Sequence, residues 1–240
     1  MLRGLVAATI IAVSAFAQAS DNRFEMKKLE IHDPKGVGEI SINYPQLLPA
    51  AGGNYQAINA EIQKIVDSYR CERFEGDEDW DYEWTAELEI KGMTEDFVSV
   101  EVEAYADCGG AHPSYWSDGF VYDARTGAKL NMDIEMGGFD FNKEWGDGDV
   151  ERYEKFKKGI ASMVIPFLDK ETKECLANVD QDMQSALDIV SYGFALEQGT
   201  VVVLGIPPHV AHVCSFRARV PYSAARGTII EGSVLHRWLR

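Results

Sequence analysis

The sequence predicts an α+β fold in which antiparallel sheets pack against helices in two interlocked subdomains. Alternating apolar and polar residues over 82–90 and 97–106 predict neighbouring strands, whereas residues 55–70 and 150–165 carry apolar side chains at helical spacing. Strands and helices come in blocks rather than in strict β-α-β alternation, which favours antiparallel sheets.

The first 19 residues have the three parts of a secretory signal peptide. Arg3 supplies a positive start, residues 5–16 are apolar, and Ala15-Phe16-Ala17 and Ala17-Gln18-Ala19 are small-x-small cleavage sequences. The apolar run is too short for a membrane span, although a retained N-terminal anchor is the alternative. We therefore expect an exported protein, either periplasmic or secreted, with no membrane span in its mature part.

The rest of the chain divides into an N-terminal subdomain over residues 20–110 and a C-terminal subdomain over 111–240. The N-terminal elements are, in order, strands over 24–33 and 39–44, a helix over 55–70 and a hairpin over 82–107. Asn54 is suited to cap the helix, and Pro45 is expected to end the strand pairing because it lacks an N–H.

The C-terminal subdomain mixes short strands with two helical regions. Its predicted elements are a strand over 120–130, a Gly/Asp-rich loop over 137–149, helices over 150–165 and 169–187, strands over 189–196, 200–206 and 214–222, and an apolar docking segment over 229–239. In the last strand, alternation points Arg217 and Arg219 away from the core.

The charge excludes nucleic acid as a natural partner. The chain has a formal charge of −16, which becomes −17 without residues 1–19 because Arg3 is their only charged residue. A nucleic-acid duplex needs a basic surface. Cationic proteins, metal ions or basic substrates suit this charge better, and the alternative is that the charge serves only solubility.

Four cysteines in an exported chain predict two disulfides. Of the three possible pairings we expect Cys71–Cys108 and Cys175–Cys214, one in each half. Each bond would contribute about 3–4 kcal/mol in the chain-entropy model. The chain has no CxxC motif, which argues against a zinc ribbon or a thioredoxin-type redox site.

Several motifs recur together in a known order. They are SINYPQL, FVSVEVEAYADCGGAHP, FVYDARTGAKL and GTVVVLGIPPHVAHVCSFRARVPY. In this order the chain resembles the exported module of two adjoining domains of unknown function that is shared by the lysozyme-sensing anti-sigma factor RsiV and the peptidoglycan deacetylase PdaC. The resemblance implies a non-catalytic α+β module and, by analogy with the anti-sigma factor, the binding of a lysozyme-like enzyme. His209 departs from the pattern, because family members often have an aromatic residue there.

The family motif at the end of the acidic strand consists of Gly109, Gly110, Ala111, His112 and Pro113. His112 is a weak candidate for a general base, with Ser114 or Asp107 as partners. No GxSxG or HExxH motif accompanies it. We therefore expect His112 to be a structural corner residue and the protein not to be an enzyme, with an envelope hydrolase as the least favoured alternative.

No cofactor or metal ion is predicted. His209, His212 and Cys214 form a weak metal motif, because the expected disulfide uses the cysteine and the two histidines do not share a face of an extended segment. Asp77, Asp79 and Asp81 alternate as in a calcium loop, but Tyr82 replaces the required glycine. Weak, irregular calcium binding stays open there and over residues 140–151, beside the alternative of a solvated acidic loop.

Partner-binding candidates lie on the acidic hairpin and beside it. Parity places Glu87, Glu89, Glu101 and Glu103 on one side of the sheet. Trp80, Tyr115 and Trp116 are the aromatic candidates, whereas Trp84 is assigned to the core. Acidic groups near aromatic rings suit a cationic protein surface, or else a wall glycan stacked on the rings.

Overall fold

In the computed structural model the chain forms two sheets and several helices, which confirms the α+β class. The structure describes residues 22–32, 38–69, 82–108, 113–137, 139–140, 146, 148–208 and 214–239. In the described part no helix is long and apolar enough to cross a membrane.

The first sheet has five strands in the order β1-β2-β3-β4-β5. They are β1 (Phe24–His32), β2 (Gly38–Leu47), β3 (Tyr82–Met93), β4 (Phe97–Asp107) and β5 (Ser114–Asp123). Neighbours are antiparallel except β2 and β3, which run parallel over six residue pairs, Gly38↔Tyr82 to Asn43↔Glu87. The predicted hairpin is present, and β5 extends to Ser114, six residues before the predicted start of that strand.

Pro45 does not end β2, contrary to expectation. The strand continues to Leu47 against β1, where Pro45 lies opposite Met26. On the other side, pairing with β3 has already ended at Asn43. Pro45 is tolerated because it follows the doubly paired part of the strand.

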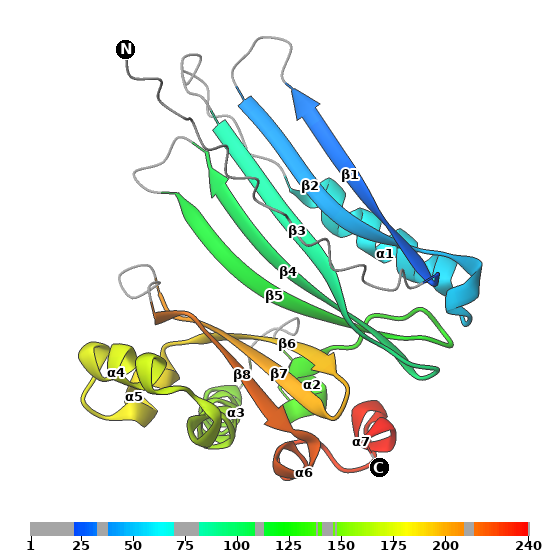
Figure 1. Cartoon of the computed structure of the whole chain (residues 1–240). Coiled ribbons are helices and arrows are strands. Elements are labelled where there is room, and N and C mark those ends of the chain that lie inside the picture. The colour runs from blue at the N-terminus through cyan, green and yellow to red at the C-terminus, as the bar shows by residue number, and fades with distance from the viewer. Residues whose placement is uncertain are drawn as a thin grey trace, which may run out of the picture.

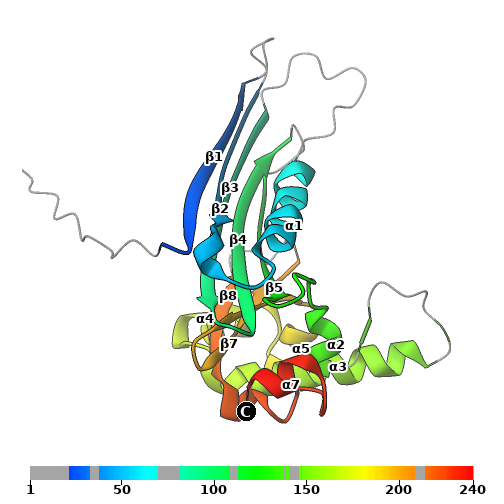
Figure 2. The ribbon, with the colours of Figure 1, turned by 90° about the vertical axis from the view of Figure 1, so that its right-hand side faces the viewer.

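Helix α1 (Tyr55–Ser68) covers one face of the first sheet (Figure 2). Ile58, Ile62 and Val66 recur at helical spacing and are buried against the sheet, where each contributes about 1.5–3 kcal/mol. The Asn54 side chain caps the helix by accepting a hydrogen bond from the N–H of Ala57. The apolar residues of β3 and β4 that face α1 form the other half of this core.

The second sheet crosses beneath the lower ends of β3–β5 (Figure 1). It contains β6 (Ser191–Glu197), β7 (Thr200–Ile206) and β8 (Phe216–Pro221), in the order β6-β7-β8 and all antiparallel. One side of it packs on a helical layer made of α2 (Met132–Gly137), α3 (Asp149–Val164), α4 (Lys170–Val179), α5 (Met183–Asp188), α6 (Tyr222–Ala225) and α7 (Val234–Trp238). The expected helix over 169–187 is interrupted between α4 and α5, where Asp182 caps the start of α5.

The two sheets share a core, so the subdomains are interlocked. Phe97 and Val121 belong to the first sheet, yet their side chains pack in the cluster that the helices and the second sheet build. Because β5 pairs with β4, the division predicted at residue 110 falls inside the first sheet rather than between the two sheets.

Two glycines allow the backbones of β5 and β6 to approach closely. A Cβ atom on Gly119 would lie 2.0 Å from the carbonyl oxygen of Phe194, and one on Gly193 would lie 2.8 Å from Oδ1 of Asp118. The first contact is with backbone and excludes a larger residue, whereas at Gly193 the Asp118 side chain would have to shift and the Asp118 Cα would lie 3.1 Å away. These two positions therefore decide where the second sheet meets the first.

Candidate functional site

The part of the first sheet that faces away from α1 and lies beyond the second sheet is an open polar surface, here called the open face. A groove of about 420 Å³ runs across β2, β3, β4 and β5 on this surface. Its lining residues are Ser41, Asn43, Thr85, Ala86, Glu87, Glu103, Ala104, Tyr105 and Tyr115. Hydroxyl, amide and carboxylate groups thus line most of the groove.

Glu87 and Glu103 lie directly opposite each other on β3 and β4. Both are exposed, and within the described residues neither carboxylate has an ion-pair or hydrogen-bond partner. Like charges opposed across strands destabilise the sheet by some tenths of a kcal/mol. A cation supplied by another molecule would therefore stabilise this pair.

Glu89 and Glu101 form the next opposed pair on this side of the sheet, as their parity predicts. Their surroundings differ, because Glu89 is ion-paired with Lys91 and Glu101 is only 2% exposed. The expectation that Glu101 belongs to the exposed acidic surface is therefore wrong. The second sheet covers it.

Arg217 of β8 reaches Glu101 across the two sheets. Its Nη1 donates to Oε1 of Glu101 at 2.5 Å, and its Nη2 donates to Oε1 of Glu197 at 3.1 Å. Arg219 completes the cluster through Nε, which donates to Oε2 of Glu197 at 2.8 Å. We call these four side chains the inter-sheet ion cluster. Arg217 points away from its own core, as predicted, but into the contact with the first sheet rather than into solvent.

The pKa values in this cluster follow from burial and hydrogen bonding. Burial raises the pKa of Glu101, although the Arg217 guanidinium acts in the opposite direction. The hydrogen bond from Arg219 holds the pKa of Glu197 below its usual range. Breaking a buried pair is costly because one charge stays behind without a partner.

The aromatic candidates divide between the two faces of the sheet. Tyr115 is 58% exposed and lies on the open face, with its ring centroid 4.8 Å from that of Tyr105. Trp116 faces the other way and packs against Trp84 and Tyr69, at centroid distances of 5.1 and 6.0 Å. Trp116 therefore packs at the edge of the core beneath α1 and is not part of the acidic surface. Trp84 is a core residue, as predicted.

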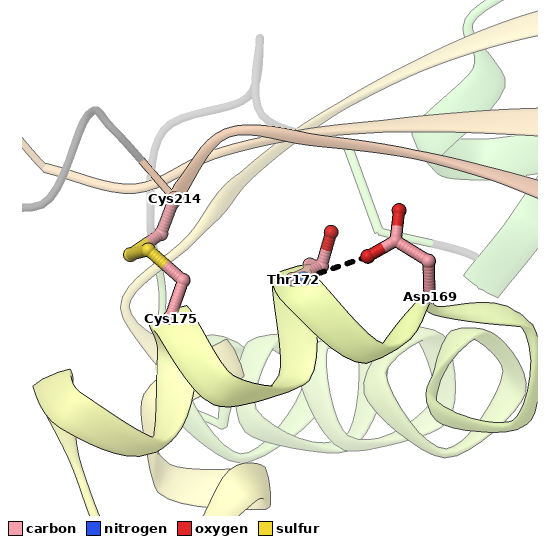
Figure 3. The surroundings of a disulfide bond; sticks show 4 residues. All are labelled: Asp169, Thr172, Cys175 and Cys214. Carbon is pink, nitrogen blue, oxygen red and sulfur yellow. Dashed lines mark hydrogen bonds between the residues drawn. A yellow bond between two sulfur atoms is a disulfide. The ribbon is translucent and has the colours of Figure 1, made fainter.

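The disulfide predicted between Cys175 and Cys214 is present, with a Cα–Cα distance of 5.5 Å (Figure 3). It joins α4 to the residues just before β8. Asp169 caps α4 by accepting a hydrogen bond from the N–H of Thr172 at 2.7 Å, which lowers the pKa of Asp169. Since Arg217 follows Cys214 by three residues, the disulfide ties the strand that carries Arg217 to the helical layer.

Several other predicted residues lie outside the described part of the chain. They are Cys71, Trp80, Gly109, Gly110, Ala111, His112, His209 and His212, and the acidic segments 77–81 and 141–145. Cys108 is disulfide-bonded, as expected, and its predicted partner is among them. Pro113 is described and half-buried, just before β5. Among the described residues, no three His, Cys, Asp or Glu side chains come together as a metal site.

A second hollow, here called the crossing pocket, lies where β5 meets β6. It has a volume of about 340 Å³ and is lined by Asp118, Gly119, Phe120, Lys129, Asn131, Met132, Asp133, Tyr192, Gly193 and Phe194. No sequence pattern predicts this pocket. The one local feature that indicates it is Asp118. This charged residue lies on the same side of β5 as Trp116, Phe120 and Tyr122, which face the core, and its stretch was not predicted as a strand.

Comparisons with known proteins identify two solved structures of similar shape. A DUF3298 family protein from Pseudomonas aeruginosa PAO1 is 12% identical, with 88% of this chain and 96% of that chain covered and a TM-score of 0.45. A member of the DUF3298 family from Bacteroides fragilis is 10% identical, with 90% and 97% covered and a TM-score of 0.49. No protein-family model and no curated protein matches the chain.

Proposed function

We propose that this protein is an exported, non-catalytic binding module of the cell envelope that recognises a cationic protein through the open face. The observation that carries the proposal is the opposed pair Glu87 and Glu103 in the lining of the groove, which forms no ion pair among the described residues. Lys91 lies beside this pair but is ion-paired with Glu89. A lysine or arginine of a partner would relieve the repulsion between Glu87 and Glu103.

Two further features support a protein partner. The formal charge of −16 favours the approach of a basic protein by electrostatic steering. The exposed ring of Tyr115 beside the carboxylates supplies apolar contact area of the kind enriched at interfaces. A lysozyme-like enzyme fits this chemistry, and the resemblance to the RsiV and PdaC module points to the same class.

Binding to hen-egg lysozyme at low and at moderate salt tests the proposal. We expect binding that weakens with salt, and a Glu87→Gln/Glu103→Gln variant that binds roughly three- to tenfold more weakly. The matched control is Glu151→Gln/Glu231→Gln, which removes the same charge from exposed positions on the helical side. Absence of binding at both salt concentrations, or equal loss in the control, contradicts the specific role of the open face.

A second candidate is a module that binds wall glycan. It is favoured by the stacked pair Tyr105 and Tyr115 at the edge of a groove lined by hydroxyl and amide groups. Purified peptidoglycan sacculi separate the two candidates. Binding that ignores salt and is lost in Tyr115→Ala would favour the glycan, whereas binding confined to low salt would favour the cationic protein.

An envelope hydrolase that uses His112 is the least favoured alternative. It requires an activity that His112→Ala abolishes while the melting temperature stays unchanged. A loss of melting temperature in that variant instead supports the structural role.

A further inference from the structure

The crossing pocket is independent of the open face, since the two hollows share no lining residue. Its walls come from three separate parts of the chain: β5, the segment 129–133 that leads into α2, and β6. Its volume of about 340 Å³ is within the range of small-molecule sites.

The pocket brings together charged groups of both signs, and the Lys129 ammonium attracts the carboxylates of Asp118 and Asp133 without forming an ion pair with either. Lys129 stands at the exposed rim, whereas Asp118 and Asp133 are half-buried. Within the described structure no ion pair joins Lys129 to either carboxylate, and the Asp133 carboxylate accepts no hydrogen bond. Asp118 accepts one from the N–H of Gly119, through Oδ1 at 2.7 Å. Polar groups that are partly removed from water normally form hydrogen bonds or ion pairs. These side chains can therefore form such bonds with a ligand.

Burial raises the pKa of both carboxyl groups. For Asp133 the pKa rises to about 6, and the negative charges of Asp118 and Asp140 add to the effect of burial. Burial likewise lowers the pKa of Lys129. Groups whose charged forms are disfavoured in this way gain most from a ligand of opposite charge at short range.

Aromatic rings complete the walls. The Lys129 ammonium lies 4.1 Å from the centroid of the Phe120 ring. The Tyr192 hydroxyl donates to the carbonyl of Leu187, so this residue offers its ring rather than a free hydroxyl. An adjoining hollow of about 200 Å³ shares Asp133 and Tyr192 with the crossing pocket and continues toward Tyr153, Phe156 and Lys157. The buried Lys157 ammonium lies 5.5 Å from the Tyr153 ring centroid and 5.1 Å from that of Tyr192, and it donates a hydrogen bond to the carbonyl of Val190.

We propose that the crossing pocket binds a small zwitterion of the α-amino acid class, with the ligand carboxylate on Lys129 and the ligand ammonium between Asp118 and Asp133. The side chain of the amino acid extends into the adjoining hollow, which has aromatic rings and the Lys157 ammonium in its lining. A simple cation leaves Lys129 unused, and a simple anion meets two carboxylates. A ligand that carries both charges satisfies all three groups.

Calorimetric titration of the purified protein tests the proposal with matched probes. L-Leucine and L-phenylalanine carry both charges, isoamylamine and phenethylamine lack the carboxylate, and 4-methylpentanoate and 3-phenylpropionate lack the ammonium. We expect at least one amino acid to bind, and its singly charged analogues to bind about tenfold more weakly or not at all. The proposal is overturned if neither amino acid binds below about 10 mM, or if an analogue binds as tightly as its parent.

Two variants assign the contacts. Lys129→Met is expected to weaken amino-acid binding about tenfold while the weak affinity for the amine stays the same, whereas Asp133→Asn is expected to weaken both. Lys158→Met and Glu231→Gln are matched controls at exposed positions outside the pocket and are expected to change neither. Equal effects of Lys129→Met on amine and amino acid would contradict the assignment. None of these readouts depends on the open face, so this proposal and the proposed function fail separately.

Discussion

Two neighbouring pairs of glutamates on one hairpin have opposite surroundings. Glu87 and Glu103 are exposed and lack cationic partners among the described residues, whereas Glu89 and Glu101, the next pair along the same strands, are bonded to Lys91 and Arg217. The residue pattern is the same for both pairs. The difference comes from β8, which brings a guanidinium to Glu101 and buries it. A row of like charges on a strand is therefore a binding surface only where no second layer covers it.

The largest effect is expected from removing the cation of the covered pair. Arg217→Met leaves Glu101 buried without its partner, and we expect the free energy of unfolding to fall by about 3–4 kcal/mol. Urea unfolding measures it. The double variant Arg217→Met/Glu101→Gln is expected to recover part of the loss, because no charge is then left buried. If the single and double variants are equally destabilised, the charge of Glu101 is not the cause.

A somewhat smaller effect is expected where the two sheets cross. Gly119→Ala places a methyl group against the carbonyl oxygen of Phe194, and we expect a loss of about 2–3 kcal/mol. Gly227→Ala is the matched control, since a Cβ there meets no atom within 4 Å and Gly227 has no positive φ. Thermal unfolding of both proteins compares them. A stable Gly119→Ala variant would show that the sheets can separate without cost, and would weaken the explanation for the burial of Glu101.

The buried carboxyl of the crossing pocket gives a pH-dependent effect. The pKa of Asp133 is about 6 in the folded chain and about 3.9 when unfolded, so its contribution to stability is present below pH 4 and is lost as pH rises through 6. We expect Asp133→Asn to raise the melting temperature above that of the wild type at pH 7.5. At pH 4 the two proteins should melt together. A constant difference at both pH values would contradict a titrating Asp133.

The smallest effect distinguishes the two glutamate pairs directly. Glu87→Gln removes the repulsion with Glu103 and is expected to stabilise the chain by a few tenths of a kcal/mol. Glu89→Gln removes an ion pair with Lys91 instead, so it is expected to be neutral or slightly destabilising. Urea midpoints at low salt measure both changes. Equal shifts in the two variants would mean that the pairs do not differ in the way described.

Much of the fold follows from local patterns. The parity of β3 and β4 predicts which side chains are buried under α1, and the Asn54 cap and the apolar spacing predict where that helix begins. The start of β5 was missed because Ser114 to Gly119 do not alternate, having two aromatic residues together and then Asp118 and Gly119. The break between α4 and α5 was missed because polar helix-forming residues continue up to it.

The site was predicted less well than the fold, and for a physical reason. Sequence parity identifies the side of a sheet on which a residue lies, and it did so for the four glutamates. It did not separate Trp116 from Tyr115, because residues 114–119 were not predicted as a strand; within β5 these two consecutive residues lie on opposite sides of the sheet. What parity does not reveal is whether that side meets water or another layer.

The class of the fold, the acidic charge, the facing glutamates and the Cys175–Cys214 disulfide are all predictable from the amino-acid sequence, because each depends on local periodicity, composition or a small number of possible cysteine pairings. Three features follow from the packing of distant elements instead: Glu101 is buried against Arg217, Trp116 belongs to the core, and Asp118, Lys129 and Asp133 surround one pocket. Trp116 is in the core because it packs against Tyr69 and Trp84 beneath α1, whereas the other two outcomes depend on where the second sheet crosses the first. That crossing is set by the close approach of Gly119 to Phe194 and of Gly193 to Asp118, residues more than seventy positions apart in the chain, and no local pattern encodes such a contact.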